Sequence, residues 1–178
     1  MPKLVDSHAH MQFTDYDEDR AQVIQRALDG GIWIVNSGSN LENSKSVIKL
    51  ADEYEDGVYA TVGIHPSEVG EGFNKEKIRL MALHPKCVAI GECGLEYTSR
   101  VRLAEIGFSE IDNKEAQAEL FTHHINLSHE TKKPLVIATG KALLPFIPET
   151  ATKILVIFPI KAGYIYPKKN KALFPRAE

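Results

Sequence analysis

The sequence predicts an α/β fold, a TIM-type (β/α) barrel that is incomplete and holds about five to six of the eight βα units. Short apolar segments alternate with amphipathic ones along the 178 residues, which indicates strands connected by helices and a parallel sheet. Polar residues suited to metal binding follow several strands, at the ends where (β/α) barrels hold their sites. No Gly-x-Gly-x-x-Gly segment follows a strand, so the sequence favours the barrel over a dinucleotide-binding doubly wound sheet.

The first half of the chain predicts three strands separated by two helices. Hydrophobic residues at a spacing of three and four predict a helix over residues 17–29, and Gly30-Gly31 ends it. The same spacing predicts a second helix over residues 42–54. The strands are expected at residues 3–7, 32–37 and 58–64.

The second half continues the alternation up to about residue 138. Asn74 is a suitable N-cap for a helix over residues 74–83, and a longer helix is expected over residues 113–131. A long loop over residues 93–112 precedes that longer helix. Strands are expected at residues 87–92 and 134–138, with a further candidate strand at residues 153–158.

The composition is that of an ordinary globular domain and shows no bias toward one kind of partner. The formal net charge is -3, which gives no general attraction to nucleic acid or to a membrane surface. No apolar run is long enough to span a membrane, and the N-terminus does not resemble a signal peptide, so we expect a cytoplasmic protein. Cys87 and Cys93 are expected to be reduced and buried.

Two histidines near the N-terminus are the first candidate metal ligands. Residues 6–10 read Asp-Ser-His-Ala-His and directly follow a short apolar run. Because side chains two residues apart along a strand lie on the same face, His8 and His10 are expected to project to one side. Two imidazoles on one side can hold one divalent metal ion. The alternative is a chance pair of histidines near a chain end.

Glu92 and His65 are the candidate catalytic residues. Glu92 closes the apolar strand over residues 87–92, so its carboxylate is expected at the same end of the sheet as the histidine pair, where it would be a third metal ligand. The alternative for Glu92 is a solvated acid at a strand end. His65, in Gly-Ile-His-Pro, ends the third strand on the same rim and could contact substrate or donate to a developing oxyanion; a capping role is its alternative. The histidines at 84, 123, 124 and 129 are expected in a loop, at the surface or in helix packing.

Three segments resemble successive motifs of the TatD family of metal-dependent deoxyribonucleases, in order and spacing. They are residues 6–10 (Asp-Ser-His-Ala-His), 62–66 (Val-Gly-Ile-His-Pro) and 89–95 (Ala-Ile-Gly-Glu-Cys-Gly-Leu). The segment around Gln117 and Phe121 and the run at 133–137 are similar to the family's fourth helix and fifth strand. The resemblance implies a TIM-type barrel, a centre of Mg²⁺, Zn²⁺ or Mn²⁺, and hydrolysis of phosphodiester bonds, typically in DNA. By motif, His8 and His10 match ligands of the first metal, and Glu92 matches the bridging carboxylate.

The resemblance ends after residue 137, and the departures fall on metal ligands of the family. Ala138 stands where the family has a histidine at the end of its fifth strand. The family also takes a histidine from strand six and an aspartate from strand eight, whereas the last histidine here is His129 and the last aspartate is Asp112. Glu96 replaces the usual aspartate of Gly-Leu-Asp-Tyr. We therefore expect one metal ion rather than two and an impaired hydrolase.

Residues 138–178 differ in character from the rest of the chain, with five prolines and neither histidine nor aspartate. We expect a partial barrel domain over residues 1–158, followed by a basic, proline-containing tail over residues 159–178 that is poorly ordered. One hypothesis is that the chain is C-terminally truncated or frameshifted after about residue 137.

Three functions are compatible with these residues. The first is a metal-dependent hydrolase that cleaves DNA or another phosphodiester substrate, impaired by the loss of later ligands. The second is a non-catalytic remnant that binds one metal or a partner. Such a remnant could self-associate through its unpaired sheet edges, and we expect no membrane binding. The third is a barrel hydrolase of cyclic amides or phosphomonoesters, which the Gly-Glu-Cys-Gly-Leu segment disfavours because amidase relatives commonly use a carboxylated lysine.

Overall fold

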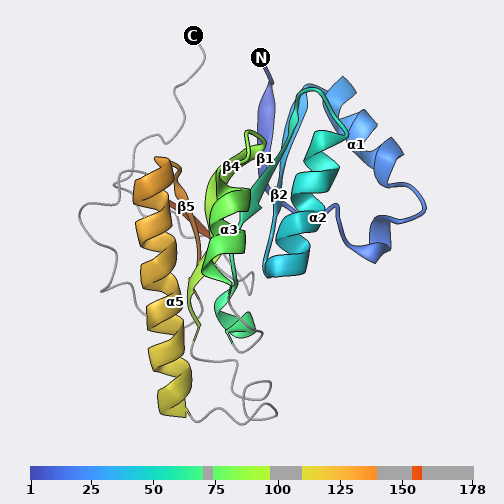
Figure 1. The fold of residues 1–178 in the computed structure, drawn as a ribbon. Coiled ribbons are helices and arrows are strands. Elements are labelled where there is room, and N and C mark those ends of the chain that lie inside the picture. Colours follow the sequence, from blue (N-terminus) through green and yellow to red (C-terminus); the bar gives the residue numbers. More distant parts are fainter. Residues whose placement is uncertain (70–73, 97–109, 140–153, 158–178) are drawn as a thin grey trace, which may run out of the picture.

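The computed structural model describes residues 1–69, 74–96, 110–139 and 154–157, and within these ranges six strands form one parallel sheet (Figure 1). The strands are β1 (Leu4–Ala9), β2 (Ile32–Ser37), β3 (Val58–Val62), β4 (Cys87–Leu95), β5 (Leu135–Thr139) and β6 (Ile154–Ile157). Their order in the sheet is their order in the chain, and each pair of neighbours is parallel. This is the arrangement of an incomplete TIM-type barrel, as the sequence predicts.

Helices connect the successive strands of the first five and cover the sheet (Figure 1). They are α1 (Arg20–Asp29), α2 (Leu41–Asp52), α3 (Lys75–Ala82) and α5 (Glu110–Thr131), with short 3-10 helices η1 (Thr14–Tyr16) and η2 (Pro66–Glu68). Asn40 and Asn74 cap α2 and α3, since each side chain accepts a hydrogen bond from a backbone N–H of the first turn. The N-cap role expected for Asn74 is confirmed.

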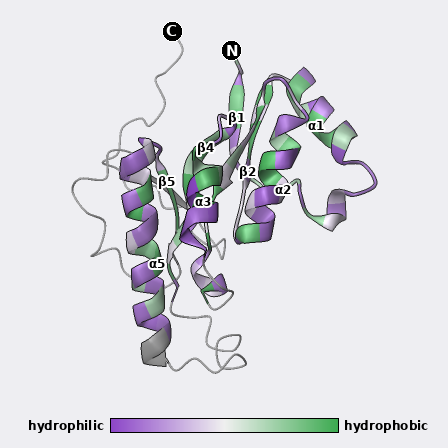
Figure 2. Cartoon of the chain, in the orientation of Figure 1, coloured by the Kyte–Doolittle hydropathy of each residue, from purple (hydrophilic) through white to green (hydrophobic). Residues whose placement is uncertain are grey.

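The core lies between the helices and the sheet. Ile24 of α1 and Val47 of α2 pack in one cluster with Ile34 of β2. Ile78 of α3 and Leu127 of α5 belong to a second cluster, built on β4 and β5. Figure 2 shows hydrophilic and hydrophobic residues along the same helices, as amphipathic packing requires. Each buried aliphatic side chain contributes about 1.5–3 kcal/mol relative to exposure, so these clusters hold the strand ends in place.

Several boundaries differ from those expected. The first strand continues to Ala9 rather than ending at residue 7, and β4 continues through Glu92 to Leu95. The first helix begins at Arg20 instead of residue 17, because the 3-10 turn Thr14–Tyr16 precedes it. Within the loop predicted over residues 93–112, the first three residues belong to β4 and the last three to α5, while 97–109 lie outside the described residues.

The outer strands are β1 and β6. On β1 the apolar side chains of Leu4 and Val5 are 65% and 41% exposed. Residues 158–178 lie outside the described part of the chain, so the predicted boundary at residue 158 and the poorly ordered tail stay predictions.

Cys87 and Cys93 are both buried and free, as expected of reduced thiols. In the part of the chain that the structure describes, every helix is too short or too polar to cross a membrane. The cytoplasmic location stays a prediction.

Strands β3 and β4 approach very closely at Gly63, just beyond the end of β3. A Cβ atom on Gly63 would lie 2.6 Å from the carbonyl oxygen of Glu92 and 2.7 Å from Cα of Gly91. Both neighbours are backbone atoms, which cannot move aside as a flexible side chain would. The glycine is therefore required where the two site-bearing strands meet.

We predict that Gly63→Ala lowers the free energy of unfolding by about 2 kcal/mol or more, because the added methyl group overlaps the β4 backbone. Chemical denaturation followed by circular dichroism measures this change. Gly30→Ala, at the exposed C-cap of α1, is the control and should change stability by less than about 1 kcal/mol. Equal effects of the two substitutions would contradict the close approach.

Candidate metal centre

Three side chains converge at the carboxyl ends of the strands: His8 in β1, His10 directly after β1, and Glu92 in β4. Nε2 of His8 lies 3.1 Å from Oε1 of Glu92, and Nε2 of His10 lies 3.4 Å from the same oxygen. The two Nε2 atoms are 3.1 Å apart. Of the described residues, only these three form a group of three or more His, Cys, Asp or Glu side chains spaced to hold a metal ion. The structure thus brings together the three residues that the sequence predicts as metal ligands.

Strands β1 and β4 are irregular where the candidate ligands His8 and Glu92 lie. Asp6 pairs with Ile34 and Ala9 with Asn36, so β1 has one more residue in this interval than β2. In β4, the interval from Ile90 to Cys93 likewise has one more residue than its partner in β5. An extra residue bends a strand and redirects side chains, and such bulges occur often beside active sites. Regular alternation, from which His8 and His10 were expected on one face, is thus interrupted in β1 between Asp6 and Ala9.

Ser37, the last residue of β2, holds the far side of both histidine rings. Its hydroxyl lies 3.0 Å from Nδ1 of His8, and its carbonyl oxygen accepts a hydrogen bond of 3.2 Å from Nδ1 of His10. The amide of Gln12 also donates to that carbonyl, at 3.0 Å. Partners on Nδ1 fix the ring orientation and leave Nε2 to a metal ion. Sequence reasoning missed Ser37, although its place at the end of the strand next to β1 was a usable signal.

The polar atoms of the centre fit a cation. Nδ1 of His10 donates to a carbonyl, so Nε2 of the neutral ring carries a lone pair, and this lone pair faces Nε2 of His8. Oε1 of Glu92 is buried without a hydrogen bond of good geometry from any described residue, although Nε2 of His8 is 3.1 Å away. Buried polar atoms normally have a partner. A divalent metal ion held by two imidazoles and one carboxylate would supply that partner.

The protonation states also suit metal binding. Burial lowers the pKa of His10 below its ordinary value, against the opposing effect of Glu92. Burial alone would raise the pKa of Glu92, but the close contact with Nε2 of His8 and the electrostatic effects of His8, His65 and His10 outweigh it, so this pKa is lowered. At neutral pH, therefore, the imidazole of His10 is neutral and the carboxylate is ionised, which are the forms that bind metals.

His65 combines a structural contact with a position facing the centre. Its Nδ1 accepts a hydrogen bond from the backbone N–H of Ser67, which caps η2. The proton of the neutral ring is therefore on Nε2, which lies 3.8 Å from Oε2 of Glu92. Burial lowers the pKa of His65 and favours that neutral form. The capping alternative is observed, and the ring still presents an N–H toward the centre.

The loop that follows β2 ties the two catalytic candidates together. The backbone N–H of Glu92 donates to the carbonyl of Gly38 at 2.8 Å, and the N–H of His65 donates to the carbonyl of Ser39 at 2.7 Å. Neither contact was predicted, because residues 38 and 39 carry no signal of their own in the sequence. The positions of Glu92 and His65 thus depend on one shared backbone segment.

Two buried polar residues of α5 contact the strand ends that carry these candidates. Nε2 of His124 accepts a hydrogen bond from the backbone N–H of Ile64, and Gln117 binds the backbone of Glu96. Sequence reasoning placed His124 at the surface or in helix packing and gave Gln117 only a family match; the available signal was their spacing of seven residues, which places both on one helix face.

Ala138 lies in β5, paired with Gly94 of β4. A methyl side chain cannot bind a metal, so Ala138 supplies no ligand at the position where the family pattern has a histidine. His129 is exposed on α5 and does not belong to the group of three.

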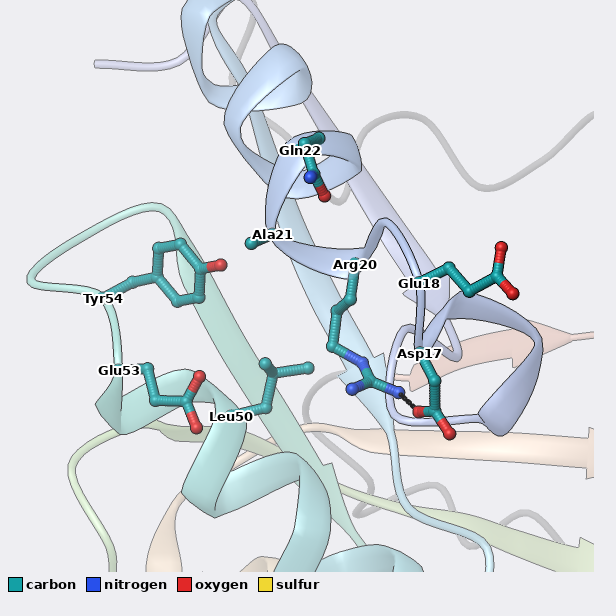
Figure 3. Close-up of a pocket in the computed structure, with 8 residues that line it drawn as sticks. All are labelled: Asp17, Glu18, Arg20, Ala21, Gln22, Leu50, Glu53 and Tyr54. Atoms are coloured by element: carbon teal, nitrogen blue, oxygen red, sulfur yellow. Dashed lines mark hydrogen bonds and ion pairs between the residues drawn. The ribbon is translucent and has the colours of Figure 1, made fainter.

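A separate surface pocket lies where α1 begins and α2 ends (Figure 3). Its arginine, Arg20, forms an ion pair of 2.5 Å with Asp17 and donates to the carbonyls of Met11 and Phe13. Arg20 thus fastens the loop that follows His10. The pocket contains none of the candidate ligands, so it does not belong to the metal centre.

Comparison with known proteins decides the family. Residues 5–151 match the model of the family described as TatD related DNase. The chain belongs to this family. The TatD resemblance found in the sequence motifs is thereby confirmed.

Individual TatD relatives agree with this assignment. The chain is 32% identical over 127 residues to a protein named 3'-5' ssDNA/RNA exonuclease TatD from Rahnella sp. (strain Y9602), covering 70% of this chain and 44% of that protein. It is 34% identical over 145 residues to a Mycobacterium tuberculosis protein named uncharacterized metal-dependent hydrolase TatD, covering 78% and 52%. The crystal structure of the TatD homologue YJJV from Escherichia coli K12 matches with a TM-score of 0.61 and 26% identity, covering 76% and 50%. The chain spans about half the length of these relatives.

The buried imidazole of His124 gives a testable pH dependence. Burial, the largest effect, lowers its pKa to about 4, although the hydrogen bond to Leu120 acts in the opposite direction. Between about pH 6.5 and about pH 4 the unfolded chain binds a proton that the folded chain excludes, so stability must fall as the pH falls through this range. The expected loss from this residue is about 3 kcal/mol.

Urea unfolding between these pH values measures the loss in the wild type and in His124→Gln, which lacks the titrating ring. We expect a shallower decrease for the variant. The same decrease in both proteins would show that His124 is not held neutral.

Proposed function

We propose that this protein is a metal-dependent hydrolase that cleaves phosphodiester bonds of DNA, with reduced activity. The convergence of His8, His10 and Glu92 on one point carries the proposal. Membership of the TatD related DNase family supports the reaction class, and related proteins are named as nucleases or metal-dependent hydrolases. Because the chain spans about half the length of these relatives, its activity and its substrate are part of the proposal.

Each residue has a separate task in the proposed mechanism. His8, His10 and Oε1 of Glu92 would hold one divalent ion, which would supply Lewis-acid chemistry beside the substrate. Oε2 of Glu92 is directed toward His65. Because the carboxylate is ionised at neutral pH, Oε2 can accept a proton. Nε2–H of His65 is a donor for a non-bridging phosphate oxygen as negative charge develops on it.

We infer one metal ion, Mg²⁺, Zn²⁺ or Mn²⁺, rather than two. Glu92 bridges two ions in the family pattern, but the described residues offer no further group of ligands beside it, and Ala138 contributes none. Two-metal catalysis clamps both the attacking and the leaving oxygen. A single ion stabilises only part of that charge, which supports reduced rather than full activity.

A second function is favoured by Ala138 and by the exposed edge strand β1. A chain that keeps three ligands but lacks the strand-five histidine could bind a metal without turnover. The apolar side chains of Leu4 and Val5 on an edge strand support self-association in that case.

The proposed function predicts that His8→Ala abolishes nuclease activity on a single-stranded DNA oligonucleotide in the presence of Mn²⁺. The substitution should also weaken Mn²⁺ binding at least about tenfold, because the ion loses one of three protein ligands. Product release on gels and calorimetric titration with Mn²⁺ measure the two effects.

His129→Ala is the matched control, since His129 is an exposed histidine on α5 outside the centre. It should leave cleavage and Mn²⁺ affinity unchanged. Wild-type protein that binds Mn²⁺ but does not cleave DNA would favour the non-catalytic function, and cleavage that survives in His8→Ala would refute the proposed site.

A further inference from the structure

We propose that helix α5 positions the centre, with Gln117 and His124 fixing the carboxyl-end backbones of β4 and β3 and thereby the placement of Glu92 and His65. The meaning of this placement for catalysis rests on the proposed function. The positioning itself follows from hydrogen bonds between α5 and two neighbouring strand ends.

Gln117 binds the end of β4 at two points. Its Oε1 accepts from the N–H of Glu96 at 2.8 Å, and its Nε2 donates to the carbonyl of Glu96 at 2.9 Å. Nε2 also donates to Oδ1 of Asn113 at 2.8 Å, which sets the orientation of the amide. The side chain is fully buried, so losing these bonds leaves polar groups without water. Glu96 directly follows β4 and is four residues beyond Glu92.

His124 binds Ile64, the residue directly before His65. Its Nε2 accepts from the backbone N–H of Ile64 at 3.1 Å, and its Nδ1 donates to the carbonyl of Leu120 at 2.7 Å. These two bonds define one neutral tautomer, since the carbonyl can only accept and the N–H can only donate. Burial favours the same neutral state by lowering the pKa of the ring.

Gln117 and His124 lie on the same face of α5. Residues 117 and 124 are seven positions apart, about two turns, so their side chains leave the same side of the helix. Between them Leu120 and Phe121 are buried in the core cluster that also contains Ile64. The apolar contacts hold the helix against the sheet, and the two polar residues then fix its register on the strand ends.

Two backbone amides near these strand ends show whether α5 holds them in place. The N–H of His65 is bonded to the carbonyl of Ser39, and the N–H of Glu92 to the carbonyl of Gly38. The N–H of Ala60, in the middle of β3, is bonded to the carbonyl of Lys86 just before β4 and serves as a reference, because Ala60 is four residues before Ile64. If α5 positions the strand ends, the first two amides become mobile when its contacts are lost, while the reference does not.

Amide hydrogen exchange of the full chain, followed by NMR, tests the proposal with Gln117→Asn and His124→Asn. Asparagine at 124 still reaches Leu120 but is too short for Ile64. We expect His124→Asn to speed exchange at His65 at least about tenfold relative to Ala60, and Gln117→Asn to do the same at Glu92. His124→Gln, which keeps an acceptor for Ile64, should restore the wild-type ratio.

Leu127→Ala is the matched control. Leu127 is a buried residue of the same helix, and the cavity should cost about 2–5 kcal/mol of stability without removing a hydrogen bond to either strand end. In this variant the exchange rates of His65, Glu92 and Ala60 should rise by one common factor. The same common factor in the asparagine variants would overturn the proposal; should one asparagine variant not fold, the other decides through its own reporter amide.

Exchange needs neither metal nor DNA, so its outcome is separate from that of the proposed function. In parallel titrations, Gln117→Asn should weaken Mn²⁺ binding at least about fivefold per folded molecule, and Leu127→Ala should leave it within about twofold. Selective exchange in a protein that binds no Mn²⁺ would retain the positioning role and refute the metal centre. Uniform exchange with intact Mn²⁺ binding would do the reverse.

Discussion

The buried carboxylate of Glu92 is the constraint on which the site depends. A carboxylate taken out of water must be compensated, and here Nε2 atoms of His8 and His10 lie within 3.4 Å of one of its oxygens. Ser37 contacts Nδ1 of both rings, and the backbone N–H of Glu92 donates to the carbonyl of Gly38. Oε1 of Glu92 and the unprotonated Nε2 of His10 thus lie close together, an arrangement that a cation would stabilise.

The fold serves this constraint through small departures from regularity. One extra residue in β1 and one in β4 occur beside His8 and beside Glu92. Gly63 lets the two neighbouring strands approach where a Cβ would collide with the backbone. Bulges and close approaches of this kind weaken the ladder locally, and the apolar packing of α3 and α5 on β4 offsets that loss. The candidate metal centre and the core therefore depend on the same strands.

Much of the architecture could be predicted from the sequence, because apolar periodicity decides element type and glycines or Asn caps mark several ends. The convergence of the candidate ligands His8, His10 and Glu92 was predictable from residue type and position near strand ends. Ser37, Gln117 and His124 were missed, because a strand-end position and a seven-residue spacing are weak signals and the roles of these residues depend on tertiary hydrogen bonds. The continuation of β4 to Leu95 was missed because Glu92, a polar residue within the strand, resembles a strand end.

The most direct test of the central claim is the metal content of the full chain by elemental analysis, after equilibration with Mn²⁺ and removal of free ion. The three-ligand centre predicts about one ion per wild-type chain and almost none in Glu92→Gln, in which the anionic ligand is neutral. A content near two ions per chain would contradict the single centre. A content near zero in the wild type would contradict the assignment of His8, His10 and Glu92 as ligands.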